Sequence, residues 1–125
     1  GIDEEQRMEI LKLRARIAVA SGANEEQVRI LEEIVGIDPL DGEALLLLGQ
    51  HWFRENDYER ATLYFDRAMG MEQHEAEAAR GQAQVLARQG RYAEALPLLR
   101  RAQTLDPRES VQQFLEQIER IATTR

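Results

Sequence analysis

Two stretches of the chain, 34 residues apart, have similar sequences: RENDYERATLYF (residues 54–65) and RQGRYAEALPLL (residues 88–99). Shifting the second stretch back by 34 positions places Tyr92 on Tyr58. The same interval separates three residues of the kind that tolerates the left-handed backbone conformation at the end of a helix. These residues are Gly22, Asn56 and Gly90. A fixed period of this length is typical of proteins built from stacked structural repeats.

The residues between these turn markers favour helices. Strong helix formers dominate the composition, and only three prolines and eight glycines interrupt them. Apolar residues recur at helical spacing, so each period holds two helices and two short turns. The expected helices span about 4–20, 25–36, 42–54, 58–70, 76–89, 92–105 and 109–122. The sequence therefore predicts an all-α chain of three antiparallel helix pairs followed by a seventh helix.

The seventh helix is strongly amphipathic. Its apolar residues, which follow an i, i+3, i+4, i+7, i+10 pattern, are Val111, Phe114, Leu115, Ile118 and Ile121. The last helix pair would otherwise leave an apolar flank exposed to water, so we expect this helix to cover that flank.

At these positions the repeated unit resembles the tetratricopeptide repeat (TPR), a 34-residue helix pair. The middle unit, which starts at Gly42, matches the family at Leu45, Leu48, Gly49, Trp52, Asn56, Tyr58, Ala61, Phe65 and Ala68. The third unit, which starts at Ala76, matches it at Ala83, Leu86, Gly90, Tyr92, Ala95, Leu99, Ala102 and Pro107. The first unit, which starts at Met8, is more divergent and matches at Leu11, Ala15, Gly22, Leu31 and Pro39.

The resemblance implies a right-handed α-solenoid of antiparallel helix pairs. We expect a single domain over residues 1–125, with repeats at about 8–41, 42–75 and 76–109 and a capping helix at about 109–122. Small residues such as Ala61 lie where the two helices of one repeat cross, and large residues such as Phe65 fill the space beside them.

Composition and charge exclude several classes of function. The net charge of −7 and the pI near 4.9 argue against nonspecific binding to nucleic acid or to anionic membranes. The chain has no cysteine for a thiol nucleophile or a zinc–thiolate site, and His51 and His74 lie 23 residues apart, outside any metal-binding spacing. The longest wholly apolar run is 44–48, which predicts no direct membrane insertion. We expect no catalytic residue, no metal site, no cofactor and no enzymatic activity.

The first residue of the chain indicates whether the sequence is a piece of a longer protein. Gly1 rather than Met stands at the first position, so we expect a trimmed piece of a longer protein. The composition predicts a soluble protein, and it leaves the cytoplasm and the periplasm both open as its compartment.

The resemblance also implies where a partner binds, because the first helix of each TPR lines a concave groove. Carried over position by position, it brings five basic residues and three apolar ones onto one surface of an otherwise acidic protein, the apolar ones exposed. With two glutamines, the expected peptide-binding groove consists of Lys12, Arg16, Leu46, Leu47, Gln50, Phe53, Arg54, Arg80, Gln84 and Arg88. Leu46 and Leu47 have a second interpretation, as contacts to another copy of the chain or to a flanking repeat.

One well-described ligand mode of the family does not fit. The clamp that binds the C-terminal carboxylate of chaperones requires Lys, Asn, Asn, Lys and Arg at five groove positions. This chain has Lys12, Arg16, Leu47, Glu77 and Gly81 there, so only Lys12 matches. We therefore expect a basic and apolar groove without the clamp.

The resulting hypothesis is a non-enzymatic protein–protein interaction module that binds a partner peptide or helix, acidic and hydrophobic in character, in its concave groove. Two alternatives remain open from the sequence. The chain could be a helical accessory or scaffold domain of a larger enzyme or of an assembly or secretion protein, or it could be a self-associating structural module that forms a homo-oligomer.

Overall fold

The computed structural model describes residues 3–22 and 24–124. The described residues form seven α-helices and one short 3-10 turn. Their bounds are α1 Glu4–Ser21, α2 Asn24–Ile37, α3 Gly42–Arg54, α4 Tyr58–Met69, η1 Glu72–His74, α5 Glu75–Arg88, α6 Tyr92–Leu105 and α7 Glu109–Thr123. Each α-helix begins and ends within one residue of the bounds that the sequence predicts, so the all-α fold class is confirmed.

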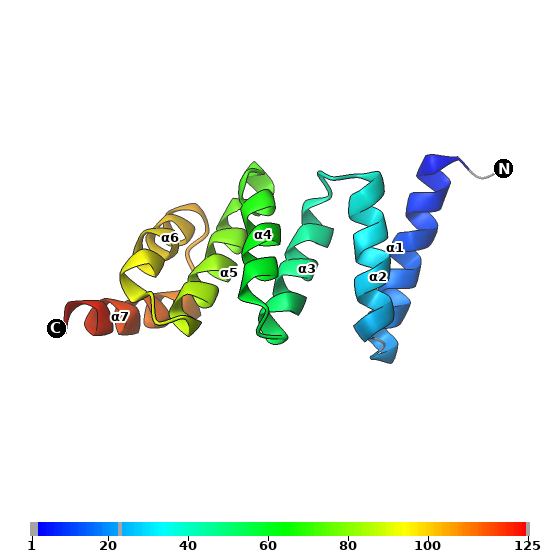
Figure 1. Cartoon of the computed structure of the whole chain (residues 1–125). Helices are drawn as coiled ribbons and strands as arrows, with labels where there is room; N and C mark the ends of the chain where they lie inside the picture. The colour runs from blue at the N-terminus through cyan, green and yellow to red at the C-terminus, as the bar shows by residue number, and fades with distance from the viewer. Residues whose placement is uncertain (1–2, 23, 125) are drawn as a thin grey trace.

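The helices stack in chain order into an elongated array, with α1 at one end and α7 at the other (Figure 1). The closest packing is within the pairs α1–α2, α3–α4 and α5–α6, and each pair also contacts the next one. Helices α3 and α5 have the most crowded positions, because α3 packs against α2, α4 and α5, and α5 packs against α3, α4 and α6. This arrangement of three pairs and a final helix is the one that a repeat architecture requires.

The predicted turn markers adopt the backbone conformation expected of them. Gly22 and Gly90 have φ angles of 74° and 75°, and Asn56 has a φ angle of 61°. A side chain with a branched Cβ is strained in this left-handed region, which explains why glycine and asparagine recur at an interval of 34 residues.

Aspartate side chains start three of the helices. Asp3 accepts a hydrogen bond from the Gln6 backbone N–H at 2.8 Å, and the Gln6 side chain accepts one from the Asp3 N–H at 3.2 Å, which completes a capping box. Asp57 likewise accepts from the Arg60 backbone N–H at 3.1 Å. These bonds satisfy backbone donors that a helix leaves unpaired in its first turn.

Asp41 combines this capping role with an ion pair to another helix. Its carboxylate accepts from the Ala44 backbone N–H at 3.1 Å and lies 3.2 Å from the Lys12 ammonium group of α1. The Asp41 side chain is only 10% exposed, whereas that of Lys12 is 49% exposed. We expect the cap, more than the ion pair, to contribute to stability, because half-exposed ion pairs are screened by water.

Replacing Asp41 by alanine should therefore lower the free energy of unfolding by about 1–2 kcal/mol. Asp41→Asn should cost much less, because asparagine caps helices as well as aspartate does and loses only the charge. Urea denaturation followed by circular dichroism measures both. An equal loss in the two variants would contradict the assignment of the effect to the cap.

The centre of the stack is organised around Phe65 of α4. Its ring lies over two glycines, Gly49 of α3 and Gly81 of α5, and a Cβ atom added at either position would lie 2.7 Å or 2.5 Å from the ring. Ala61, one turn before Phe65, is fully buried. The small residues of the repeat are therefore explained by close approach of three helices around one aromatic side chain.

Helix α7 closes the other end of the core. Leu115 and Ile118 are buried in an apolar cluster with Ala83, Ala95 and Leu99 of the last pair. The prediction that the seventh helix covers the apolar flank of that pair is confirmed.

Candidate functional site

Two hollows lie at the two ends of the surface to which α1, α3, α5 and α7 contribute. The first hollow has a volume of about 270 Å³ and lies between α1, α2 and α3. Its apolar lining consists of Ala15, Val19, Leu31, Ile34, Ala44 and Leu47. The second hollow has a volume of about 550 Å³ and lies between α3, α5, α6 and α7. Its large apolar lining residues include Phe53, Tyr92, Leu99, Val111, Phe114 and Ile121.

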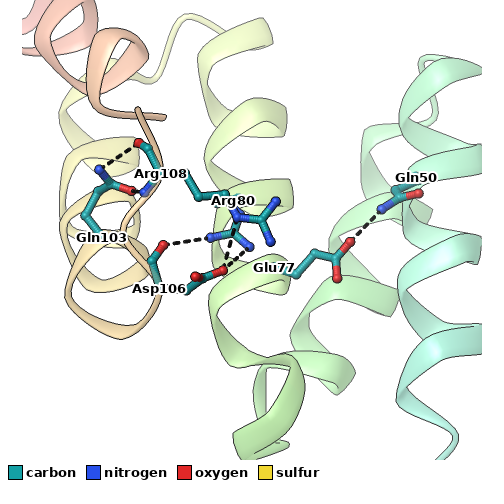
Figure 2. A network of polar contacts seen from close by, with 6 residues as sticks. All are labelled: Gln50, Glu77, Arg80, Gln103, Asp106 and Arg108. Carbon is teal, nitrogen blue, oxygen red and sulfur yellow. Dashed lines mark hydrogen bonds and ion pairs between the residues drawn. The ribbon is translucent and has the colours of Figure 1, made fainter. Parts of the chain in front are cut away.

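The residues that the sequence predicted for the groove gather at these hollows. Three of the ten line the first hollow, namely Lys12, Arg16 and Leu47. Four line the second hollow, namely Phe53, Arg80, Gln84 and Arg88. Gln50 lies between α3 and α5, where its amide donates a hydrogen bond to the Glu77 carboxylate at 3.3 Å (Figure 2). Arg54 is exposed at the end of α3 and lines neither hollow.

The prediction that Leu46 lies exposed in the groove is wrong. The sequence interpretation placed it on the exposed groove surface, but its side chain is buried, with 4% of its surface accessible. The reason is the position of α3, which packs against α2, α4 and α5 and so retains little free surface. Leu47, the next residue, is half-buried and reaches the first hollow.

The first hollow carries balanced charge. Lys12 and Arg16 contribute two positive charges, and Asp41 and Glu43 contribute two negative ones. The Lys12 ammonium group is paired with Asp41. An apolar floor beside charges that sum to zero suits an uncharged aliphatic group.

The second hollow is positively charged. Arg80 and Arg88 line it, and of the described residues in its lining none carries a carboxylate. The Arg88 guanidinium lies over the Phe53 ring, 5.0 Å from the ring centre, and its side chain is exposed to solvent. Stacking of this kind fixes the plane of the guanidinium and leaves its N–H donors available to an anion.

Arg80 is held in place by the turn between α6 and α7. Its guanidinium donates to the Asp106 carboxylate at 3.3 Å and to the Asp106 carbonyl at 3.4 Å, and its side chain is only 12% exposed (Figure 2). A hydrogen bond from Arg108 is the main cause that lowers the pKa of Asp106, and Arg80 adds to it. Gln103 in turn exchanges two hydrogen bonds with the Arg108 backbone, at 2.9 and 3.1 Å. Arg80 is therefore a fixed part of the wall of the hollow, whereas Arg88 is the exposed cation of the hollow.

Six lining residues of the second hollow come from α7, and none of them was part of the predicted groove. The large apolar ones are Val111, Phe114, Ile118 and Ile121. The sequence assigned them to the cap alone. The sequence carries a signal for this second role, because one buried helix face requires fewer apolar residues than α7 carries, and Ile121 remains exposed. The final helix thus covers the core with Leu115 and Ile118, and it lines the hollow with Ile118, Val111, Phe114 and Ile121.

Two further properties concern residues 3–22 and 24–124 only. Within these ranges no three histidine, aspartate or glutamate side chains are grouped so that they could hold a metal ion. None of the helices formed there combines the length and the apolar character needed to span a bilayer.

Family models match the chain twice. Both are described as tetratricopeptide repeat, one matching residues 53–118 and the other residues 12–71. The first match covers 66 of the 125 residues, which is more than half of the chain. A search of curated proteins gives no match.

Solved structures share the fold over nearly the whole chain. The type III secretion translocator chaperone SycD of Yersinia enterocolitica is 24% identical, with a TM-score of 0.82 over 95% of this chain and 87% of SycD. The first TPR of Spaghetti (RPAP3), bound to an HSP90 peptide, is 16% identical, with a TM-score of 0.84 over 98% of both chains. An O-GlcNAc transferase of Thermobaculum terrenum is 24% identical, with a TM-score of 0.78 over 94% of this chain but only 23% of the transferase.

Proposed function

Because the chain belongs to the tetratricopeptide repeat family, we propose that it is a non-enzymatic module that binds a segment of a partner protein along the surface between the two hollows. Seven of the ten residues chosen from the sequence for binding line these hollows, and this observation carries the proposal. Peptides occupy two of the similar structures: an HSP90 peptide in Spaghetti, and a peptide of the translocator YopD in SycD. Both observations support a peptide or a helix as the ligand.

The different charges of the two hollows define the chemistry of the partner. The second hollow, in which Asp106 binds Arg80 and Arg88 is exposed, suits a large apolar side chain next to an acidic one that Arg88 contacts. The first hollow, with balanced charge and an aliphatic floor, suits a smaller uncharged side chain. We therefore propose a segment with two anchors, acidic and hydrophobic at the α7 end and aliphatic at the α1 end.

We do not propose that this chain binds a C-terminal carboxylate through the HSP90-type clamp. Lys12 is the one residue that fits the clamp pattern, and its ammonium group lies 3.2 Å from the Asp41 carboxylate. The peptide seen with Spaghetti therefore serves as a negative control for this chain.

A random peptide library displayed on phage and selected on the purified chain tests the proposal. We expect the enriched peptides to carry Asp or Glu beside a large apolar residue, and we expect the HSP90 peptide not to bind. One variant for each hollow, Val19→Asp and Ile121→Asp, should weaken the selected peptides by at least about tenfold. Leu63→Asp on α4 is the matched control, because Leu63 is exposed as these residues are but lines neither hollow.

Two results of this experiment would contradict the proposal. Affinity that falls equally in the Leu63→Asp variant, or that survives both hollow variants, would place binding elsewhere. Enrichment of basic peptides would contradict the acidic anchor.

One observation favours a second candidate function. In the O-GlcNAc transferase structure, a stack of this shape corresponds to 23% of a longer chain. The present helices could likewise serve as an accessory domain that recruits a partner to a larger protein. The sequence of the full gene decides between a free-standing module and such a domain.

A further inference from the structure

Exposed apolar side chains concentrate on α1. Ile10, Leu13 and Ile17 are all exposed, and Leu13 exposes 52% of its surface. Their spacing of three and four residues places them on one side of the helix, which we call the outer face of α1. A continuous apolar stripe of this kind on a helix surface marks a contact that another helix can cover.

The outer face of α1 points away from the rest of the stack. A different side of the helix, with Leu11, Ala15 and Ala18, is buried where α1 packs against α2. Helix α1 is also the end of the array (Figure 1). Lys12 and Val19 of the first hollow lie on a third side, because successive residues turn by about 100° around a helix. Arg16, which also lines the first hollow, lies between that side and the outer face. A partner on the outer face would therefore reach the edge of the first hollow at Arg16 and leave Lys12 and Val19 open.

The charges of α1 are divided between its two halves. Residues 3–10 contain the acids Asp3, Glu4, Glu5 and Glu9 and one base, Arg7, which gives a net charge of −3. Residues 11–21 contain the bases Lys12, Arg14 and Arg16 and no acid, which gives a net charge of +3. Such a helix is complementary to an antiparallel copy of itself, whereas parallel pairing would align like charges.

We propose that two copies of the chain form a symmetric dimer through antiparallel packing of the outer faces of α1. A twofold axis at the level of residue 12 brings Ile10 of one copy over Leu13 of the other, twice. Glu9 and Arg16 flank the outer face on the same side, so Glu9 of each copy then faces Arg16 of the other. Arg7 and Arg14 flank the opposite side and stay hydrated at the rim. This proposal does not depend on peptide binding.

Sedimentation equilibrium of the 125-residue chain tests the dimer. We expect a monomer–dimer equilibrium between micromolar and millimolar concentrations. Leu13→Glu should raise the dissociation constant by about 100-fold or more, because the symmetric contact loses two buried leucines and gains two buried carboxylates. Leu63→Glu is the matched control, because Leu63 is also exposed, at 56%, but lies on α4.

Circular dichroism and thermal melting of Leu13→Glu show whether the variant remains folded, as its exposure predicts. A chain that is monomeric at every concentration would overturn the proposal. So would a dimer that Leu63→Glu disrupts and Leu13→Glu does not, since that result would place the interface on another surface or on a different segment.

The orientation has its own test, which the absence of native cysteine makes simple. Glu9→Cys and Arg16→Cys variants are mixed and oxidised. Antiparallel packing should give mainly mixed disulfides between Cys at position 9 and Cys at position 16. A majority of disulfides between two Glu9→Cys copies would indicate parallel helices and contradict the proposed symmetry.

Discussion

Replacing Phe65 by alanine should lower the free energy of unfolding by about 3–5 kcal/mol. The ring is 2% exposed and lies against Gly49 of α3 and Gly81 of α5, so its removal opens a cavity between three helices at once. Those glycines have no side chain that could move into the space. Urea denaturation followed by circular dichroism measures the loss, and Leu63→Ala, two residues away but exposed, should change stability by less than about 0.5 kcal/mol.

The same contact predicts a coupling. Gly81→Ala alone should cost about 1–3 kcal/mol, because its Cβ would lie 2.5 Å from the Phe65 ring. In a Phe65→Leu background the smaller side chain leaves room for the added methyl group, so the same substitution should cost clearly less. An identical cost in both backgrounds would show that the ring does not explain the glycine.

The fold could be predicted from the sequence because its determinants are local and repeated. Gly22, Asn56 and Gly90 end helices by their own backbone preference, and each confirms the period independently. Tyr58 and Ala61 occur at fixed places in a unit whose geometry is the same in every copy. A helix boundary that is unclear in one repeat can therefore be placed from the matching position in the next repeat. The predicted and observed helix bounds agree to within one residue.

The candidate site was less predictable, because the accessibility of each side chain depends on contacts with other helices. The 34-residue repeat does not specify these contacts. Leu46 occupies a groove position in the repeat, yet α3 is enclosed on three sides by α2, α4 and α5, and the side chain is buried. Arg80 also occupies a groove position, but its guanidinium is bound by Asp106, 26 residues further along the chain. Position within a repeat indicates the direction of a side chain, whereas its accessibility depends on what each particular neighbour contributes.

The acidic and the basic residues are concentrated at opposite ends of several helices. The chain has a net charge of −7, but many of its acids cap helices or stand in their first turns. The second hollow lies at the opposite, C-terminal ends of α3 and α5, where Arg54 and Arg88 occur in the last turns. Basic residues there complement the negative ends of the helix dipoles. An acidic protein can in this way carry a local positive surface that its net charge conceals.

Arg88→Glu and Arg80→Glu should separate binding from stability. Arg88 is exposed and touches the ring of Phe53, so Arg88→Glu should change the free energy of unfolding by less than about 1 kcal/mol. It reverses a charge in the hollow whose described lining residues include no acid, so the affinity for an acidic peptide selected on the chain should fall by about tenfold or more. Isothermal titration calorimetry with that peptide measures the loss, and raising the salt concentration should reduce the difference between the two proteins.

Arg80→Glu should act mainly on the fold. The new carboxylate would face the carboxylate and the carbonyl oxygen of Asp106 in a pocket where the side chain is only 12% exposed, and the arginine hydrogen bonds would be lost. We expect a loss of about 1–3 kcal/mol in the free energy of unfolding, and a partial rescue by Asp106→Arg, which restores an opposite charge. If Arg80→Glu leaves stability unchanged and Arg88→Glu leaves peptide affinity unchanged, then the structural role assigned to Arg80 and the binding role assigned to Arg88 are both wrong. If each variant shows its own effect, the two arginines have separate roles: Arg80 fixes the turn between α6 and α7 that shapes the hollow, and Arg88 contacts the acidic part of the partner.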